Sequence, residues 1–240
     1  MLPHQRLIER GVVTDDRGND RPLVGNVSTS EANRIYRLVR EAQPEVSIEI
    51  GLACGVSSLA IVQALADNGC GRHYIVDPFQ RVQWGGAGLR ALHDAGLDDR
   101  VEFHEAFPEE AVPTLPRASF AFIDASHLFD LTLLDFVLVD KRLDPGGLLG
   151  FHDSGMPSVG KALRYILTNR AYRVHEPVPL TAGSRRKSRL SKALQHVPRA
   201  SRVLRPEVLT RTAEFGVQAN MAFLEKLRDD DRDWQDHVEF

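Results

Sequence analysis

Residues 49–55 read Glu49-Ile50-Gly51-Leu52-Ala53-Cys54-Gly55 and decide the fold, because they join a predicted strand to a predicted helix through two glycines. Glycine has no Cβ, so the backbone can turn sharply at Gly51 and Gly55 and come close to a ligand, toward which the following helix points free N–H groups. The motif is not the G-x-G-x-x-G of dinucleotide enzymes, since its glycines stand four apart and Glu49 precedes the first. It predicts a nucleotide-type loop, with a tight turn that holds no ligand as the alternative.

Short apolar runs alternate with longer amphipathic segments on both sides of this loop, up to about residue 180. The strands predicted from these runs are 46–50, 73–76, 101–104, 120–123, 148–151 and 172–178, with a last strand within 215–224. The predicted helices are 30–42, 56–66, 89–95, 128–143 and 159–169. This order is typical of a parallel sheet covered by helices, so the sequence predicts an α/β, doubly wound fold.

The composition of the chain is that of an ordinary globular protein. With 240 residues, 42% of them hydrophobic and 26% charged, it excludes a disordered chain, a collagen and a small disulfide scaffold. A net charge of −3 gives no overall basic character, so no nucleic-acid partner is expected. The chain has only two cysteines and no apolar leader, so we expect a cytoplasmic protein. No apolar run approaches the roughly 20 residues of a membrane span, so we expect no transmembrane segment.

Charge is unevenly distributed near the end of the chain. Residues 181–205 contain eight Arg and Lys and no acid, whereas residues 229–240 contain six acids and one Arg. We therefore expect an N-terminal extension at 1–29, one domain at 30–224 with a basic insertion at 181–205 between the last two strands, and an acidic tail at 225–240 that folds back on the insertion. The insertion could form a lid, a clamp for an anionic acceptor, a membrane-surface element or a solvated loop.

Two acids follow the next two predicted strands. Asp77 stands 22 residues after Gly55, where a carboxylate can accept hydrogen bonds from both ribose hydroxyls of a bound nucleoside. Pro78 supports the alternative that Asp77 belongs to a turn. Glu105, at the end of the strand after that, is placed to accept from the exocyclic amine of adenine or to be a solvated loop acid.

At this point the chain resembles the class I S-adenosylmethionine-dependent methyltransferases, in the branch with E-x-G-x-x-x-G. More narrowly, four segments are similar to the D-x-x-H, D, L-x-P-G-G and H-D blocks of the family that includes cephalosporin-hydroxylase-like and sugar O-methyltransferases. These segments are 122–127, Asp135, 143–147 and 151–153. The resemblance covers roughly residues 30–178 and the closing strand. It implies a Rossmann-like sheet of seven mostly parallel strands with the last one antiparallel.

The resemblance also implies roles for particular residues. Glu49, Gly51 and Gly55 would hold the methionine end of S-adenosylmethionine and Asp77 its ribose. The full set of cofactor-binding residues is expected to be Glu49, Gly51, Gly55, Ser57, Asp77, Glu105 and Asp124. In related metal-dependent members, acids matching Asp124 and Asp153 bind a divalent ion. This chain departs from that pattern because His152, rather than an acid or an amide, stands beside Asp153, and we expect Asp124, His152 and Asp153 as the ligand set.

A hydroxyl that accepts a methyl group must lose its proton, either to a base or by coordination to a cation that lowers its pKa. His127 and His152 are the predicted bases, and Mg²⁺ or Mn²⁺ is the predicted ion. Asp124, His127, His152 and Asp153 follow strands that should be adjacent, so they are expected to converge. The sequence predicts methyl transfer to a hydroxyl of a small molecule such as a sugar or natural product. It leaves open an anionic acceptor, a homo-oligomer, another reaction on this scaffold and a non-catalytic S-adenosylmethionine-binding module.

Overall fold

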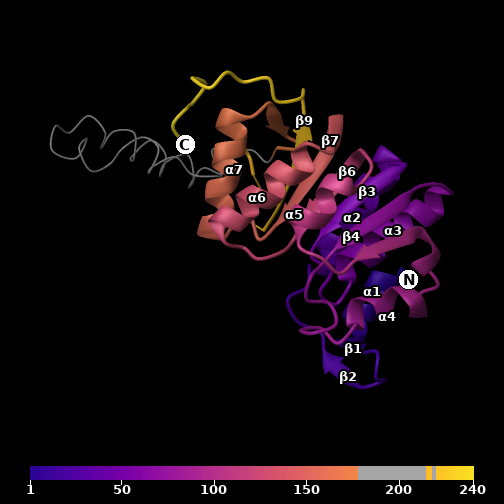
Figure 1. The fold of residues 1–240 in the computed structure, drawn as a ribbon. Helices are drawn as coiled ribbons and strands as arrows, with labels where there is room; N and C mark the ends of the chain where they lie inside the picture. The colour runs from indigo at the N-terminus through magenta and orange to yellow at the C-terminus, as the bar shows by residue number, and fades with distance from the viewer. Residues whose placement is uncertain (178–214, 218–219) are drawn as a thin grey trace, which may run out of the picture.

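A central sheet organises the chain in the computed structural model, which describes residues 1–177, 215–217 and 220–240 (Figure 1). Over these residues the sheet has seven strands in the order β5-β4-β3-β6-β7-β9-β8. The strands are β3 (Val46–Ile50), β4 (Arg72–Val76), β5 (Val101–His104), β6 (Ala118–Ile123), β7 (Leu143–His152), β8 (Tyr172–Val174) and β9 (Met221–Lys226). The first five strands in this order, β5, β4, β3, β6 and β7, pair in parallel with their neighbours. Strand β9 is antiparallel to both β7 and β8. The predicted fold is confirmed, including the antiparallel last strand.

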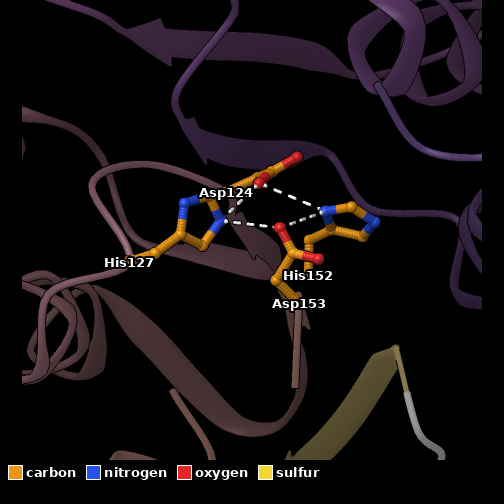
Figure 2. Close-up of side chains that lie close together, drawn as sticks. All are labelled: Asp124, His127, His152 and Asp153. Atoms are coloured by element: carbon orange, nitrogen blue, oxygen red, sulfur yellow. Dashed lines mark hydrogen bonds and ion pairs between the residues drawn. The ribbon is translucent and has the colours of Figure 1, made fainter. Parts of the chain in front are cut away.

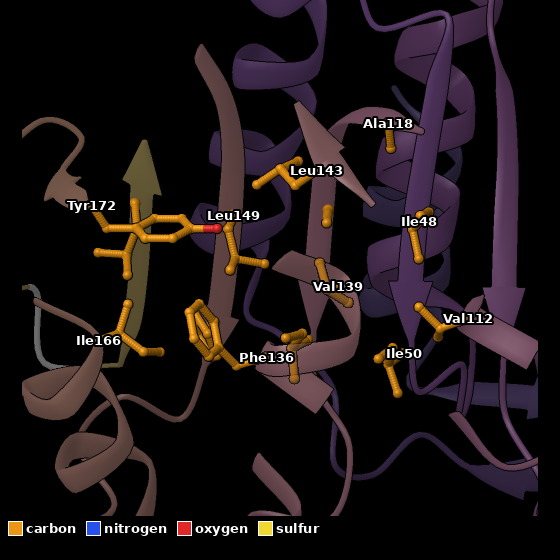
Figure 3. Packing of buried hydrophobic residues seen from close by; sticks show 14 of the residues in the cluster. Ile48, Ile50, Val112, Ala118, Phe136, Val139, Leu143, Leu149, Ile166 and Tyr172 are labelled. Carbon is orange, nitrogen blue, oxygen red and sulfur yellow. The ribbon is translucent and has the colours of Figure 1, made fainter. Parts of the chain in front are cut away.

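Helices cover both faces of this sheet. They are α2 (Thr29–Ala42), α3 (Val56–Asn68), α4 (Ala87–Asp94), α5 (Pro108–Ala111), α6 (Phe129–Asp140) and α7 (Pro157–Asn169), with 3-10 turns at Asp98–Arg100 and Val112–Thr114. Side chains alternate across a strand, so neighbouring residues of β6 serve opposite faces. Phe122 packs with α2 and α3, whereas Ile123 packs with α6 and α7, and both are buried. Figure 3 shows the core on the side of α6 and α7, in which Phe136 and Tyr172 pack edge to face.

The end of α6 and the start of β7 differ from the prediction. The helix ends at Asp140 rather than 143, and β7 begins at Leu143 rather than 148. Lys226, 1% exposed, donates to the carbonyls of Asp140 and Leu143 at 2.6 and 2.8 Å, which fixes the turn between the two elements. The pairing of β6 with β7 then shifts register across the Pro-Gly-Gly segment, an irregularity that apolar periodicity does not reveal.

The N-terminal residues contain structure that the sequence did not indicate. Helix α1 (Pro3–Arg10) and the hairpin of β1 (Val12–Thr14) and β2 (Asp20–Pro22) lie beside α3 and α4 (Figure 1). The hairpin contacts the loop before α4, where the Asp16 N–H donates to the Gly85 carbonyl at 2.9 Å. The strands are three residues long and β2 is fully exposed, so no alternating apolar pattern marks them.

The last part of the chain returns along α7. The segment between β8 and β9 includes the basic residues 181–205, which lie outside the described residues. After β9 the chain passes over α7, where Asn169 exchanges two 2.7 Å hydrogen bonds with the backbone of Val238 (Figure 1). Asp229 lies 2.8 Å from the buried Lys226 ammonium. The acidic tail therefore packs on α7, and its expected contact with the basic insertion stays a prediction. Within the described ranges, no helix is long and apolar enough to cross a membrane.

Candidate active site

The glycine loop between β3 and α3 lies against two neighbouring backbone segments. Gly51 has φ +94°, and a Cβ on it would stand 2.0 Å from the Asp124 carbonyl oxygen. Gly55 has φ +81°, and its Cβ would approach the Gly88 carbonyl oxygen to 3.0 Å. A contact within the protein thus requires glycine at position 51, and the positive φ together with a tight approach favours it at position 55. Gly51 also lines the cavity described below, whereas Gly55 does not, so its predicted contact with a cofactor stays a prediction.

Asp77 fastens this loop to the end of β4. Its Oδ2 accepts from the backbone N–H groups of Leu52 and Ala53 at 3.0 and 3.2 Å, and its Oδ1 accepts from that of Phe79 at 2.9 Å. The side chain is 5% exposed and lines the cavity. Asp77 therefore both holds the turn together and faces the cavity. A carboxylate offers about four lone-pair sites, so one remains for a ribose hydroxyl.

Glu49 is buried beside α3 and does not line the cavity. Its side chain is fully buried, its Oε2 lies 2.9 Å from His73 Nε2 and accepts from the Ser58 hydroxyl, and Oε1 has no hydrogen-bond partner among the described residues. Neither Glu49 nor the buried Ser57 lines the cavity. The alternation along β3 explains this, because Ile50 points to the α6 side and Glu49 to the α3 side. A direct contact with the methionine end therefore finds no support in this geometry.

Glu105 is engaged at the surface. Its carboxylate accepts from the Arg81 backbone N–H at 3.0 Å and from the Arg81 guanidinium. It does not line the cavity, so the predicted contact with adenine is also without geometric support.

A cavity of about 490 Å³ opens at the carboxyl ends of β3, β4 and β6. Its polar lining includes Gly51, Asp77 and Asp124. Its apolar lining consists mainly of Pro78, Phe79, Phe107, Pro108, Leu131 and Leu134. Phe79 and Phe107 meet edge to face with ring centroids 5.9 Å apart. Two further acids, Glu109 and Asp135, also line the cavity, and Asp135 lines a small neighbouring pocket together with His127 and His152.

Four predicted side chains converge, as Figure 2 shows, and one of them, Asp124, also lines the cavity. Asp124 and His127 follow β6, while His152 ends β7 and Asp153 follows it. His127 Nε2 lies 3.2 Å from both Asp124 Oδ1 and Asp153 Oδ2, and His152 Nδ1 lies 3.3 and 3.4 Å from the same two oxygens. His127 and Asp153 have φ of +56° and +50°, strained values for residues with side chains, as is common at functional sites.

The charges in this cluster stabilise one another. Burial alone would lower the pKa of His152, but Asp124, Asp153 and Glu31 outweigh it and raise that pKa to about 9. The hydrogen bond to Asp124 likewise raises the pKa of His127. Burial alone would raise the pKa of Asp124, yet the two imidazoles lower it. Asp124 and the two imidazoles therefore favour the charged forms of one another.

The donor set fits a divalent cation. One ligand atom from each of the four residues lies within 4.8 Å of the others. His152 Nδ1 is buried and has no hydrogen bond of good geometry among the described residues, although it faces two carboxylates. Buried nitrogens in native proteins almost always have a polar partner, and a bound cation would supply that partner here. Carboxylates with imidazoles suit Mn²⁺ and similar ions, and the carboxylates alone suit Mg²⁺.

Two residues that sequence reasoning missed hold the outer nitrogen of His152. Asn220, just before β9, has its amide nitrogen 3.3 Å from His152 Nε2 and donates to Glu31 Oε1 at 2.6 Å. Glu31 Oε2 lies 3.7 Å from the same Nε2. Glu31 also completes the capping box of α2 with Ser28. That capping motif was the only local signal at Glu31, and it points to helix formation rather than to a site.

Comparisons with known proteins agree with this architecture. Residues 48–154 match the family model described as a methyltransferase domain. No curated protein matches the chain at a significant level. Similar solved structures include an O-methyltransferase from Bacillus cereus in complex with SAH, with 19% identity and a TM-score of 0.54, over 64% of this chain and 76% of that one.

Two further solved structures are similar over more of the chain. The SAH-bound methyltransferase PaMTH1 from Podospora anserina has 14% identity and a TM-score of 0.58, over 85% of this chain and 81% of that one. The O-methyltransferase TomG from Streptomyces achromogenes, involved in tomaymycin synthesis and solved with SAM, has 18% identity and a TM-score of 0.52, over 84% and 82%. At such identities the likeness shows the shared fold.

Proposed function

We propose that this chain, whose residues 48–154 match the model of a methyltransferase domain, transfers the methyl group of S-adenosylmethionine to a hydroxyl of a small molecule. The observation that carries the proposal is the position of Asp124. It lines the cavity at the ends of β3, β4 and β6, and it also belongs to the cluster with His127, His152 and Asp153. Asp124 thus connects the proposed cofactor cavity with the residues that would accept a proton.

Support for S-adenosylmethionine comes from the cavity and from proteins of similar fold. The cavity volume of about 490 Å³ lies within the usual range for a small-molecule site. Asp77 stands at the cavity wall with a free lone-pair site, as a ribose contact requires. Structural neighbours were solved with SAH or SAM. The same neighbours include O-methyltransferases, which favours an oxygen acceptor.

The residues of the cluster supply what a hydroxyl acceptor needs. The methyl group of a sulfonium is already activated, so the protein mainly aligns the acceptor oxygen with it and excludes water. His127 is the more exposed imidazole, with 28% of its side chain accessible against 7% for His152, and it is the better placed base for an entering hydroxyl. Asp124 and Asp153 then stabilise the imidazolium that forms when His127 takes the proton.

A divalent ion is the second device that these residues can hold. Asp124, His152 and Asp153 would be its ligands, with His127 adjacent. When bound, Mg²⁺ or Mn²⁺ would lower the pKa of a coordinated acceptor hydroxyl. Glu31 and Asn220 would orient His152 from its outer nitrogen. A sugar or natural-product acceptor, an anionic group on it, a homo-oligomer and a cytoplasmic location stay predictions.

The experiment that tests the cluster is a titration of EDTA-treated protein with Mn²⁺. Electron paramagnetic resonance and calorimetry measure the binding. The parent protein, Asp124→Asn and Asp130→Asn are compared, because Asp130 is an exposed acid on α6 near the same loop. We expect saturable Mn²⁺ binding in the parent and in Asp130→Asn, and a loss of at least about tenfold in Asp124→Asn. Equal Mn²⁺ affinity in all three proteins would remove the cluster from the proposal.

A further inference from the structure

A small pocket borders the cluster, and its polar side chains on α6 have no part in the proposed reaction. Both imidazoles of the cluster line it, and Ile123, Phe151 and Val159 supply much of its apolar wall. About 10 Å³ of it is open to the centre of a water-sized sphere, close to the roughly 10–15 Å³ that one bound water requires. The pocket is therefore too small for a cofactor or an acceptor, and its size fits one water molecule.

Thr132 and Asp135 are the two polar side chains that α6 contributes to this pocket. They stand three residues apart in the helix, so they lie on the same face. Each residue is only 4% exposed, and neither side chain forms a hydrogen bond or an ion pair with any residue that the structure describes. Buried hydroxyl and carboxyl groups in native proteins almost always have a polar partner, because burial without one is costly. A small polar ligand would supply the partner that both groups lack.

The two imidazoles differ in which of their nitrogens is left for such a ligand. Both nitrogens of His152 face polar groups, since Nδ1 faces two carboxylates and Nε2 lies near Glu31 and Asn220. His127 Nε2 faces the same two carboxylates. Its Nδ1 lies on the far side of the ring from them, as Figure 2 shows, and forms no hydrogen bond or ion pair with the described part of the chain. His127 Nδ1 is therefore the ring nitrogen that remains for the pocket.

We propose that one buried water molecule in this pocket joins Thr132 and Asp135 to His127, and that Asp135 thereby acts as a positioning residue. His127 donates from Nδ1 to the water oxygen, and the water donates its two hydrogens to the Thr132 hydroxyl and the Asp135 carboxyl. A buried water typically makes about three hydrogen bonds. Together they hold the ring with Nε2 toward the carboxylates of the cluster. The water site stands by itself, whereas its importance for the base rests on the proposed function.

Two further observations agree with this bridge. Burial raises the pKa of Asp135 to about 7, but both the neutral and the charged carboxyl offer an oxygen that accepts from water. The bridge therefore does not depend on the charge of Asp135. His127 has a φ of +56°, and such a backbone persists where the surroundings hold the residue in place. A hydrogen bond to the ring adds to that hold.

The test compares crystal structures and histidine spectra of the parent protein with threonine variants. Thr132→Val keeps the shape of the side chain but removes the hydroxyl, and Thr132→Ser keeps the hydroxyl. Thr168→Val is the control, because the Thr168 hydroxyl bonds within α7 and lies outside this pocket. Nuclear magnetic resonance follows the hydrogen exchange of His127 Nδ1–H, which is assigned through its absence from His127→Gln.

We expect an ordered water in the parent, Thr132→Ser and Thr168→Val, and none in Thr132→Val. Exchange of the His127 Nδ1–H should be about tenfold faster in Thr132→Val than in the other three proteins, as for loss of one hydrogen bond. A threonine that served packing alone would change stability but not this exchange. Asp135→Asn keeps a carbonyl acceptor and should retain the water, whereas Asp135→Leu should lose it.

Two results would overturn the inference. One is a parent structure without this water, at a resolution at which other buried waters are visible. The other is equal Nδ1–H exchange in the parent and in a folded Thr132→Val protein. Titration of S-adenosylhomocysteine tests the proposed function separately, because Thr132 does not line the cavity and all the threonine variants should bind like the parent. A parent that holds the water but does not bind this compound would overturn the proposed function and support the water site.

Discussion

Asp77 joins structure and ligand binding in a single side chain. It accepts three backbone hydrogen bonds, two of them from the glycine loop, and still faces the cavity. Asp124 is similar, since it belongs both to the cavity wall and to the cluster with two imidazoles. We therefore expect that replacing Asp77 changes both the stability of the fold and the affinity for a ligand.

Replacement of Asp77 by alanine should weaken both properties. The buried Leu52 amide and its neighbour would lose their acceptor, and each unpaired buried donor costs about 1–3 kcal/mol. We expect the free energy of unfolding to fall by about 2–4 kcal/mol and S-adenosylhomocysteine binding to become undetectable. Urea unfolding and calorimetry measure the two effects. A folded Asp77→Ala protein with parental affinity would contradict the ribose assignment.

Asp135 should make the stability of the unliganded protein depend on pH. Its pKa is about 7 in the folded protein against 3.8 ordinarily, so the folded state binds the proton more tightly. The stability contribution of the protonated form is complete below about pH 4 and is lost as the pH rises to about 7. Asp135→Asn does not titrate there, so relative to the parent it should gain up to about 4 kcal/mol between these limits.

Urea unfolding of both proteins at about pH 5 and about pH 8 checks this, with Asp130→Asn as the exposed control on the same helix. The quantity of interest is the change in the difference between variant and parent, because a constant offset arises from packing. An identical difference at both pH values would show that the Asp135 carboxyl is not held in its neutral form by burial.

At the scale of elements, the junction of β3 with β6 decides the position of the site. The two strand ends approach so closely that the bare Cα of Gly51 faces the Asp124 carbonyl oxygen. The same approach brings the glycine loop and the cluster to one edge of the sheet. The apolar runs predicted these strands, because buried parallel strands read as continuous hydrophobic segments.

Gly51→Ala tests the close approach. The added Cβ would stand 2.0 Å from the Asp124 carbonyl oxygen, and its three nearest neighbours are all backbone atoms, which cannot move aside as the end of a flexible side chain can. Gly18, in the N-terminal hairpin, is a matched control because its φ is +82° and no atom lies within 4 Å of an added Cβ. We expect Gly18→Ala to cost about 1 kcal/mol through backbone strain alone, and Gly51→Ala at least about 3 kcal/mol in urea unfolding. Equal costs would show that the strand ends can separate freely.

The short N-terminal elements and the direction of Glu49 could not be predicted in the same way. Strands β1 and β2 have three residues each, too few to display a period. Glu49 follows a motif that suggests a ligand contact, yet the alternation along β3 turns it away from the cavity toward His73. A motif identifies which loop is involved, whereas the register of the strand decides where each side chain points.

At the scale of the whole molecule, the site is assembled from distant parts of the chain. The cluster itself was predictable, because β6 and β7 are adjacent parallel strands and their carboxyl ends share one edge. Glu31 and Asn220 were not, since they are 189 residues apart in sequence and meet only through the tertiary fold.

Glu31→Gln should separate the helix cap from the site. Glutamine can still complete a capping box, so the unfolding free energy should change by less than about 1 kcal/mol. Loss of the charge next to Asn220 and His152 should weaken Mn²⁺ binding by about tenfold, as for other groups that orient a ligating histidine. Calorimetric titration of Mn²⁺ measures this. Unchanged Mn²⁺ affinity would mean that Glu31 serves only the helix.

The most direct test of the central claim is calorimetric titration of S-adenosylhomocysteine into the full chain. The claim is that the cavity between the glycine loop, Asp77 and Asp124 is a site for an adenosyl cofactor. We predict saturable binding with a Kd at or below about 100 µM, equivalent to about −5.5 kcal/mol. The absence of both heat of binding and thermal stabilisation by this compound would contradict the claim.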